Sequence, residues 1–263
     1  MIDYTFSYLD LEYLLLIFVR VSAFVSVAPL VGGQNTGVTN TVKIAFAGFL
    51  SIMLWGVVPR ETLAYASVFG YGAIVIKEAL CGAIIGMATQ MCIQAAGFAG
   101  QIVDMMTGLS MVTMMDPTSG NQVTISATIY NQAIMVMLVV SGMYRYMISA
   151  VADSYRWIPV NGVLIQSEKL ISAMIVFLRN YIVIGFRIAL PVFIVTFTIN
   201  FVLGILAKVA PQMNMFAVGI QIKILVGLVV LYISSRMLGG AADFILHYME
   251  VLIEQFIDAM RAA

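Results

Sequence analysis

Few side chains in this sequence could carry out enzymatic chemistry. His247 is the only histidine, and the two cysteines, Cys81 and Cys92, stand eleven residues apart in an apolar stretch. On a helix this spacing separates their Cα atoms by about 16 Å, far beyond the roughly 6 Å of a disulfide. The sequence contains no CxxC, HExxH, GxGxxG or GxxxxGK[ST] pattern. We therefore predict no catalytic residue, no cofactor and no metal site.

A stripe of small and polar residues recurs at steps of three or four, which places it on one helical face. It comprises Gly82, Gly86, Gln90, Gln94, Gly97, Gln101, Asp104 and Gly108. Amides and a carboxylate cannot face lipid cheaply. One interpretation is close helix packing, in which small residues admit a neighbour and the glutamines bond across the interface. The other is that Gln101 and Asp104 line a wet pathway.

A methionine cluster follows the polar stripe directly. Its members are Met105, Met106, Met111, Met114 and Met115. Methionine packs adaptably because its side chain is unbranched and its sulfur polarizable. Asp116-Pro117 and Gly120 then break the helix. The cluster predicts either a gasket or plug, or ordinary packing.

Basic residues interrupt the apolar runs at Arg20, Lys43, Arg187, Lys208 and Lys223. Charges inside a membrane are usually paired or face water, and Asp104 is a candidate partner for Arg20. Such charges also occur in ion transporters. No two acidic residues lie within the central apolar runs to form a relay, which weakens that alternative.

The composition indicates a membrane protein. Of the 263 residues, 62% are hydrophobic and 10% charged, and the mean hydropathy is +1.02, whereas soluble domains are about 25% charged. A soluble enzyme is thereby excluded. The net charge of zero offers no basic surface for nucleic acid. An all-α fold is expected because lipid leaves open sheet edges unsatisfied.

Apolar periodicity predicts helices near residues 13–31, 42–58, 63–107, 123–143, 167–207 and 216–237, with 63–107 divided near Lys77 and Glu78. Hydropathy alone gives about six spans. The amino terminus has no basic region or cleavage site of a removable signal peptide. Loop charges are mixed, with Arg145 and Arg156 facing Asp153, so no orientation is predicted.

The last segment, residues 241–263, has a different pattern. Apolar residues at helical spacing lie opposite Asp243, Glu250, Glu254 and Asp258, which predicts an amphipathic helix. Anionic lipid would repel this acidic face, so a partner protein is favoured over the membrane surface.

The most specific motif is Ala210-Pro211-Gln212-Met213-Asn214-Met215-Phe216, followed by Gly219 and Ile222-Lys223-Ile224. It is joined by Arg20 with Ala28-Pro29, by Ala96-Gly97 to Asp104 and Gly108, and by Asp116-Pro117 with Gly120. Together, over nearly the whole chain, these residues resemble the FliR family of flagellar export-gate proteins. The relation extends more distantly to the equivalent subunit of virulence type III secretion systems. The chain departs from that family at Gly142 to Tyr146, a loop where members often carry histidine.

The resemblance implies a fold of tilted and kinked helical hairpins with a FliP-like part over residues 1–180, a FliQ-like hairpin over 181–240 and the amphipathic helix over 241–263. It implies that the loop near residues 105–122 plugs an export channel, and that apparent spans are bent and lifted partly out of the bilayer. Residues assigned to assembly or hairpin tips are Arg20, Pro29, Asp116, Pro117, Pro211, Asn214, Phe216, Gly219 and Lys223.

The function implied by the resemblance is that of a non-enzymatic export-gate subunit in the bacterial inner membrane, within the flagellar basal body. Its partners would be relatives of FliP and FliQ, the export-switch subunit FlhB, membrane lipid, and unfolded flagellar proteins in transit. The alternatives are an ion or solute transporter subunit and, with no nucleophile and base paired by motif, a membrane enzyme.

Overall fold

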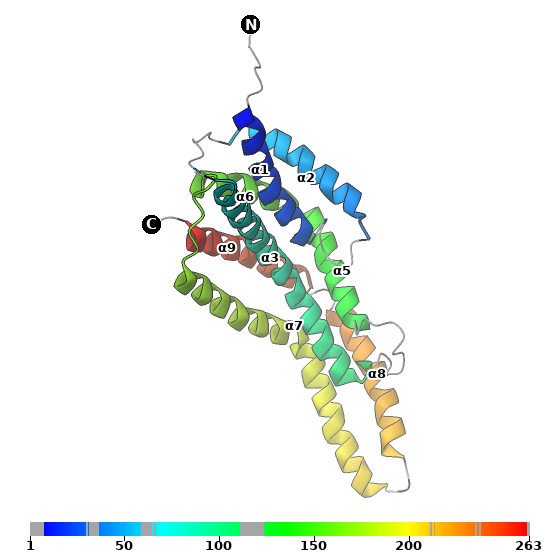
Figure 1. The fold of residues 1–263 in the computed structure, drawn as a ribbon. Coiled ribbons are helices and arrows are strands. Elements are labelled where there is room, and N and C mark those ends of the chain that lie inside the picture. Colours follow the sequence, from blue (N-terminus) through cyan, green and yellow to red (C-terminus); the bar gives the residue numbers. More distant parts are fainter. Residues whose placement is uncertain are drawn as a thin grey trace. The chain divides into compact units, whose positions relative to one another are not determined.

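A computed structural model describes residues 8–29, 31, 37–58, 65, 67–110, 124–210, 212, 214–234, 236 and 238–261. The regular structure in these ranges is helical (Figure 1), which confirms the all-α prediction. The helices are α1 (Tyr8–Val27), α2 (Asn40–Trp55), α3 (Val68–Thr107), α5 (Ile125–Val140), α6 (Met143–Trp157), α7 (Ser167–Val209), α8 (Met215–Ser234) and α9 (Leu238–Met260).

Two helices, α3 and α7, are long and apolar enough to cross a membrane, and the described residues give up to four spans if the bent pairs α5–α6 and α8–α9 each count as one. The described residues thus offer fewer candidate spans than the about six that hydropathy suggests. Within α1, the charges of Asp10, Glu12 and Arg20 interrupt the apolar run. Helix α2 has 16 residues, or about 24 Å, which is short of a hydrocarbon core.

The chain packs as two compact units. Unit 1 consists of Met1–Met91, Gly142–Phe177 and Tyr248–Ala263, and unit 2 of Cys92–Ser141 and Leu178–His247. Helices α3, α7 and α9 each begin in one unit and end in the other. The predicted boundaries at residues 180 and 240 concern relatedness to FliP and FliQ rather than packing, so they stay a prediction.

Helix α3 corrects one sequence-based expectation. The charges of Lys77 and Glu78 were expected to divide residues 63–107 into two segments, but α3 runs unbroken through them. Glu78 is completely buried and its carboxylate is held by a basic side chain, as described below. A charge that has such a partner does not end a helix.

Helix α6 corrects a second expectation, which places a loop at residues 142–146. Gly142 has a φ of +74°, which a glycine adopts without strain, and α6 begins directly after it. The buried side chains Met143, Met147 and Ala150 follow helical spacing. On the exposed side, Arg156 Nη1 lies 3.3 Å from Asp153 Oδ1, as predicted, whereas Arg145 Nε donates to the hydroxyl of Tyr144.

In unit 1, helix α1 packs against α2 and is tied to the segment before α3. The Tyr65 hydroxyl donates to Glu12 Oε2 at 2.6 Å, and this hydrogen bond raises the pKa of Tyr65. At the other end of the unit, the amide of Leu164 donates to the carbonyl of Met260. This contact fixes the end of α9 beside the start of α7.

Helix α9 is amphipathic. Leu252, Ile253 and Phe256 are buried, whereas Glu254 and Asp258 are exposed. The helix begins at Leu238, a few residues before the expected segment.

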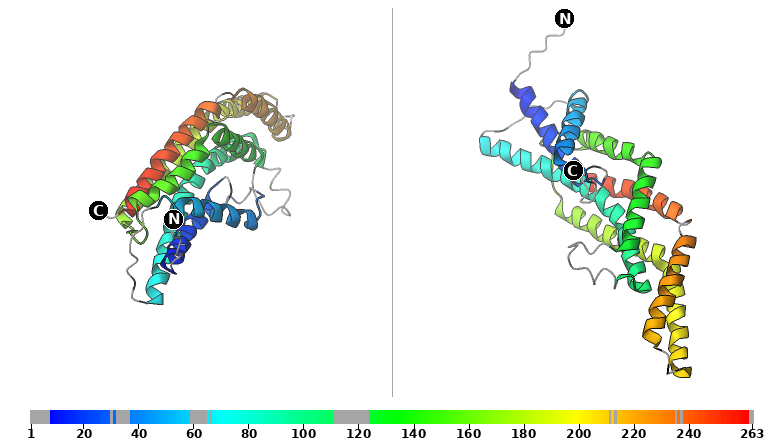
Figure 2. Two further views of the ribbon diagram at one scale, coloured as in Figure 1. Left: turned by 90° about the horizontal axis from the view of Figure 1, so that it is seen from above. Right: turned by 90° about the vertical axis from the view of Figure 1, so that its right-hand side faces the viewer.

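In unit 2, α7 and α8 lie side by side as an antiparallel hairpin (Figures 1 and 2). A Cβ atom added at Gly219 of α8 would lie 3.1 Å from Leu203 Cδ1 of α7. The hairpin brings the first residues of α8 beside the last two turns of α7.

Candidate functional site

Arg20 is the centre of a buried polar cluster in unit 1. Its side chain is fully buried, and Nε donates to Glu78 Oε2 at 2.6 Å. Nη1 donates to Ser154 Oγ at 3.3 Å and to the carbonyl of Ile158 at 3.0 Å. The guanidinium carbon also lies 4.1 Å from the centre of the Tyr155 ring. One side chain of α1 therefore ties α3 and α6 together.

The expected pairing of Arg20 with Asp104 is wrong, because Glu78 neutralises Arg20 instead. Both oxygens of that carboxylate are engaged, since Oε1 accepts from the amide of Asn161 at 3.0 Å. The only sign of Glu78 in the sequence is a charge inside an apolar run, 58 residues from its partner.

The glycines at the start of the polar stripe bring α3 against α1. A Cβ atom at Gly82 would lie 2.0 Å from the carbonyl oxygen of Arg20, and one at Gly86 would lie 2.9 Å from that of Phe24. Real side chains essentially never approach backbone so closely. These positions are contact points between helices, as the packing interpretation predicts.

Further along α3, in unit 2, the same face meets α5. A Cβ atom at Gly97 would lie 2.7 Å from Asn131 Nδ2, and one at Gly100 would lie 2.3 Å from the Cα of Ala127. Gly100 is not among the predicted stripe residues, although Ala96-x-x-x-Gly100 has the spacing of small residues that signals such an approach. Close packing thus extends along the stripe from Gly82 to Gly97, whereas a Cβ atom at Gly108 would meet no atom within 4 Å.

The glutamines behave differently from the glycines. Gln94 and Gln101 are exposed, whereas Gln90 Oε1 is buried and has no hydrogen-bond partner among the described residues. The stripe is therefore not a uniform polar face, and a wet pathway along Gln101 stays a prediction.

Asp104 is fully buried and anchors the start of α5. Its Oδ2 accepts from the amide of Ser126 at 2.8 Å and its Oδ1 accepts from the Ser126 hydroxyl at 2.5 Å. Helix α5 begins at Ile125, so the carboxylate satisfies an amide that has no acceptor within the helix and lies at the positive end of the helix dipole. This bond joins the last turn of α3 to the first turn of α5.

The described methionines of the cluster lie at the end of α3. Met105 is 62% exposed and Met106 is half-buried. The helix ends at Thr107, and Gly108 has a φ of +84°, the left-handed conformation of a helix C-terminus. The other members, Met111, Met114 and Met115, and the turn residues Asp116 and Pro117, lie outside the described residues.

Met105 and Met106 border a groove of about 450 Å³ in unit 2. Its other walls come from the α7–α8 hairpin and include Asn200, Gly219 and Lys223. Gly219 is buried and Lys223 half-buried. The groove thus combines methionine side chains with an amide and an ammonium group in otherwise apolar surroundings.

Of the remaining predicted assembly residues, Pro29 is buried just after α1. Asn214 is exposed, and its carbonyl accepts from the amide of Val218 at 3.2 Å as α8 begins. Pro211 and the side chain of Phe216 lie outside the described part of the chain.

Comparison with known proteins identifies the family to which this chain belongs. The model of bacterial export proteins, family 1, matches residues 11–249. The chain belongs to the FliR family. It is 32% identical to the flagellar biosynthetic protein FliR of Pectobacterium carotovorum over 219 residues, covering 81% of this chain and 80% of the relative. It is 30% identical to FliR of Bacillus subtilis over 227 residues, covering 85% and 86%.

Membership of the FliR family confirms the resemblance seen in the sequence. The chain is a component of the flagellar type III export apparatus in the inner membrane, and it is not an enzyme. FliR of Escherichia coli, at 25% identity over 213 residues, supports the same assignment. The transporter and enzyme alternatives are thereby disfavoured.

Proposed function

We propose that this chain helps to form and seal the channel for unfolded flagellar proteins, with the methionine-rich segment near residues 105–122 as its plug. The observation that carries the proposal is the double hydrogen bond from Ser126 to Asp104, which ties together the two ends of residues 105–125. This anchor keeps the last turn of α3 beside the first turn of α5, so the two flanking helices stay together.

Methionine suits such a seal on physical grounds. An exported chain presents side chains of every size, so a rigid wall would either leak around small ones or block large ones. Three rotatable bonds let methionine repack, while its apolar surface favours closure at about 25 cal/mol per Å² buried. The exposure of Met105 supports this role, because it leaves a methionine free to make contacts beyond its own helix.

The hairpin beside the methionines would form the wall against which the plug closes. In the groove described above, the side chains of Met105 and Met106 share the space with Leu203, Gly204 and Gly219. Small residues on α7 and α8 leave room for a repacking side chain. We assign residues 181–240 as the FliQ-like hairpin and 1–180 as the FliP-like part. The assignment rests on the hairpin of α7 and α8 and on the family resemblance.

The proposed partners are relatives of FliP and FliQ, which would complete the ring of hairpins, and FlhB. The acidic face of α9 offers a surface for a basic partner segment, since Glu254 and Asp258 are exposed. Asp258 Oδ2 lies 3.6 Å from Lys169 Nζ of the same chain in an exposed ion pair, for which a partner's basic residue would compete. Exported flagellar proteins would pass as transit substrates, and membrane lipid would cover the apolar helices.

The test replaces the five methionines at 105, 106, 111, 114 and 115 with alanine in cells and measures complex yield, flagellar protein export and passive ion permeability at rest. We expect normal complex yield with a larger resting ion leak, because alanine loses the surface that closes the channel. A matched control is Met53→Ala on α2, since Met53 is 59% exposed and lies outside the proposed plug.

A graded pair of variants tests the anchor separately. Ser126→Ala removes one of the two bonds to Asp104, whereas Asp104→Ala removes both and leaves the Ser126 amide without its acceptor. We expect the leak to increase in that order. An assembled, export-competent complex with unchanged ion permeability in every variant would refute the plug.

A further inference from the structure

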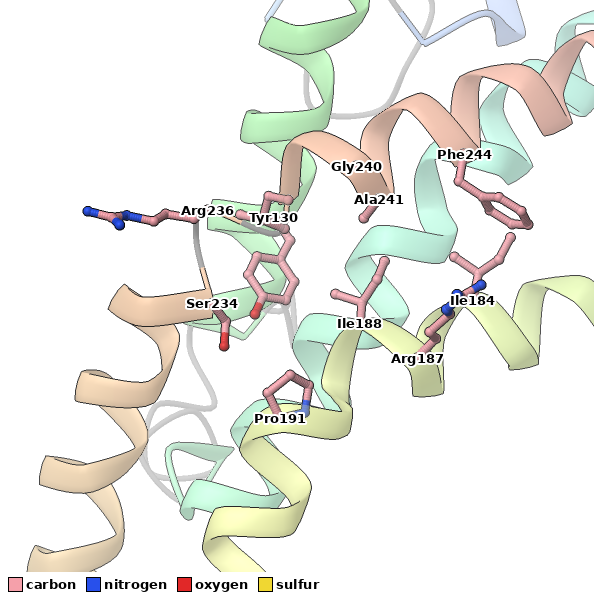
Figure 3. A pocket seen from close by; sticks show the side chains of 11 residues that line it. Tyr130, Ile184, Arg187, Ile188, Pro191, Ser234, Arg236, Gly240, Ala241 and Phe244 are labelled. Atoms are coloured by element: carbon pink, nitrogen blue, oxygen red, sulfur yellow. The ribbon is translucent and has the colours of Figure 1, made fainter.

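A second cavity in unit 2, separate from the methionine groove, measures about 470 Å³ and opens between α5, α7, the end of α8 and the start of α9 (Figure 3). Its lining residues are Tyr130, Ile184, Arg187, Ile188, Pro191, Ser234, Arg236, Leu238, Gly240, Ala241 and Phe244. None of them belongs to the proposed plug or to the buried Arg20 cluster.

The chemistry of the lining has two parts. Most of the wall is hydrocarbon, from residues such as Ile188, Pro191 and Phe244. The charged groups are Arg187 and Arg236, both exposed, and none of the described lining residues is acidic. In Figure 3, Arg187 lies beside Ile184 and Phe244, while Arg236 extends outward from the end of α8. The cavity therefore pairs an apolar interior with positive charge at its edge.

The positions of Arg187 and Arg236 relative to the apolar runs fit a membrane surface. Arg187 is followed by a charge-free run of about 20 residues that ends before Lys208, the length that crosses a hydrocarbon core. Because α8 returns antiparallel to α7, its end at Ser234 lies beside Pro191 in the cavity wall. Arg187 and Arg236 thus stand at the same end of one membrane-length hairpin, where lipid phosphates lie.

The first turn of α9 adds a third feature. Helix α9 has 23 residues and begins at Leu238, which lines the cavity with Gly240 and Ala241. The first amides of a helix have no acceptor within it and carry the positive end of the helix dipole. Hydroxyl groups of Tyr130 and Ser234 are also at the wall and can donate to phosphate oxygens.

We propose that this cavity binds one anionic phospholipid, with an acyl chain against the apolar wall and the headgroup at the rim. The exposed side chains of Arg187 and Arg236 flank that rim and would turn toward the phosphate. A free phosphate ion would leave the hydrocarbon wall unused, and a neutral lipid would leave the two guanidinium groups without a counter-charge. An anionic phospholipid satisfies both parts of the lining.

The test uses the full chain purified together with its FliP and FliQ relatives and exchanged into nanodiscs of phosphatidylcholine with or without phosphatidylglycerol. Native mass spectrometry then counts the lipids retained by the complex. We expect one additional phosphatidylglycerol to be retained by the wild type. Retention should fall about 5-fold in Arg187→Gln and about 30-fold when Arg236→Gln is added, from the attraction of each arginine to anionic lipid.

Two further variants distinguish lipid binding in this cavity from a general attraction of anionic lipid to basic residues. Arg179→Gln removes an exposed arginine of α7 that does not line the cavity, and it should retain lipid as the wild type does. Gly240→Leu places a side chain at the cavity wall without removing charge, and it should also lose the lipid because the leucine takes up its space. A Cβ atom at Gly240 meets no atom within 4 Å, so we expect the fold to accommodate the leucine. In addition, Arg187→Lys keeps the charge and should retain the lipid as the wild type does, whereas loss of the lipid in this variant would contradict a charge-based site.

The proposal is overturned if phosphatidylglycerol and phosphatidylcholine are retained equally, or if Arg179→Gln loses as much lipid as Arg187→Gln. A photo-crosslinking residue at position 188 gives an independent answer in cells. A lipid adduct there supports the proposal, whereas an adduct to another protein shows that a partner subunit fills the cavity and overturns it.

Discussion

At the scale of single residues, the ion pair between Arg20 and Glu78 makes the sharpest prediction. Both side chains are fully buried, so removing one charge leaves the other without compensation. We expect Glu78→Gln to destabilise the fold by about 3 to 5 kcal/mol. The measurement is the amount of chain that accumulates in the membrane, together with the melting temperature of the purified complex.

The matched control is Asp153→Asn, which breaks the ion pair with Arg156. Those two side chains are 49% and 71% exposed, and an exposed pair contributes about 0 to 1 kcal/mol. If Glu78→Gln accumulates and melts as Asp153→Asn does, then the pair is not what holds α1, α3 and α6 together.

At the scale of the elements, the glycines of α3 set how closely the helices approach. A Cβ atom at Gly82 would collide with the carbonyl of Arg20, whereas one at Gly72 of the same helix meets nothing within 4 Å. We expect Gly82→Ala to cost about 1 to 3 kcal/mol, typical of overpacking. Gly72→Ala should be neutral or slightly stabilising, because alanine favours helix.

Circular dichroism of the purified complexes during thermal melting distinguishes these two variants. Equal melting temperatures for Gly82→Ala and Gly72→Ala would show that α1 can shift away from α3 without loss. A lower melting temperature for Gly82→Ala alone would show that the stripe is a packing surface at that position.

The elements also show where sequence reasoning succeeds. Long apolar runs and the glycine stripe are local patterns, so the class of fold and the region of α3 could be predicted from them. The division of α3 at Lys77 and Glu78 was wrong because a local pattern cannot show that Glu78 meets Arg20, 58 residues away. The start of α6 was missed because Gly142 reads as a turn, although in the structure it precedes a helix.

The candidate site likewise has features that the sequence predicts and features that it does not. The stripe and the methionines could be found from spacing and composition, and Gly82, Gly86 and Gly97 lie where helices approach. The anchor of Asp104 on Ser126 could not be predicted, since 22 residues separate them and nothing in the sequence fixes how the chain returns between them.

At the scale of the whole molecule, a large apolar surface is left uncovered by the chain itself. Phe201 of α7 is 67% exposed and Leu225 of α8 is 67% exposed, and many other large apolar side chains on these helices are similarly open. Lipid can cover such side chains, but the exposed Arg187 and the half-buried Lys223 lie inside apolar runs. Charges in those positions require water, a lipid headgroup or a neighbouring subunit.

We therefore expect the chain to be poorly ordered when it is produced alone and to become stable when it is produced with its FliP and FliQ relatives. Neighbouring subunits would supply apolar contacts to α7 and α8 and counter-charges to residues such as Lys223, and binding of a partner to the folded state stabilises it by mass action. The measurement compares yield, monodispersity and helix content of the chain expressed alone, with those relatives, and with an unrelated membrane protein as the control. A monodisperse, cooperatively unfolding monomer with full helix content from the chain alone would contradict this dependence, because it would show that the uncovered helices and their charges are satisfied by lipid or detergent.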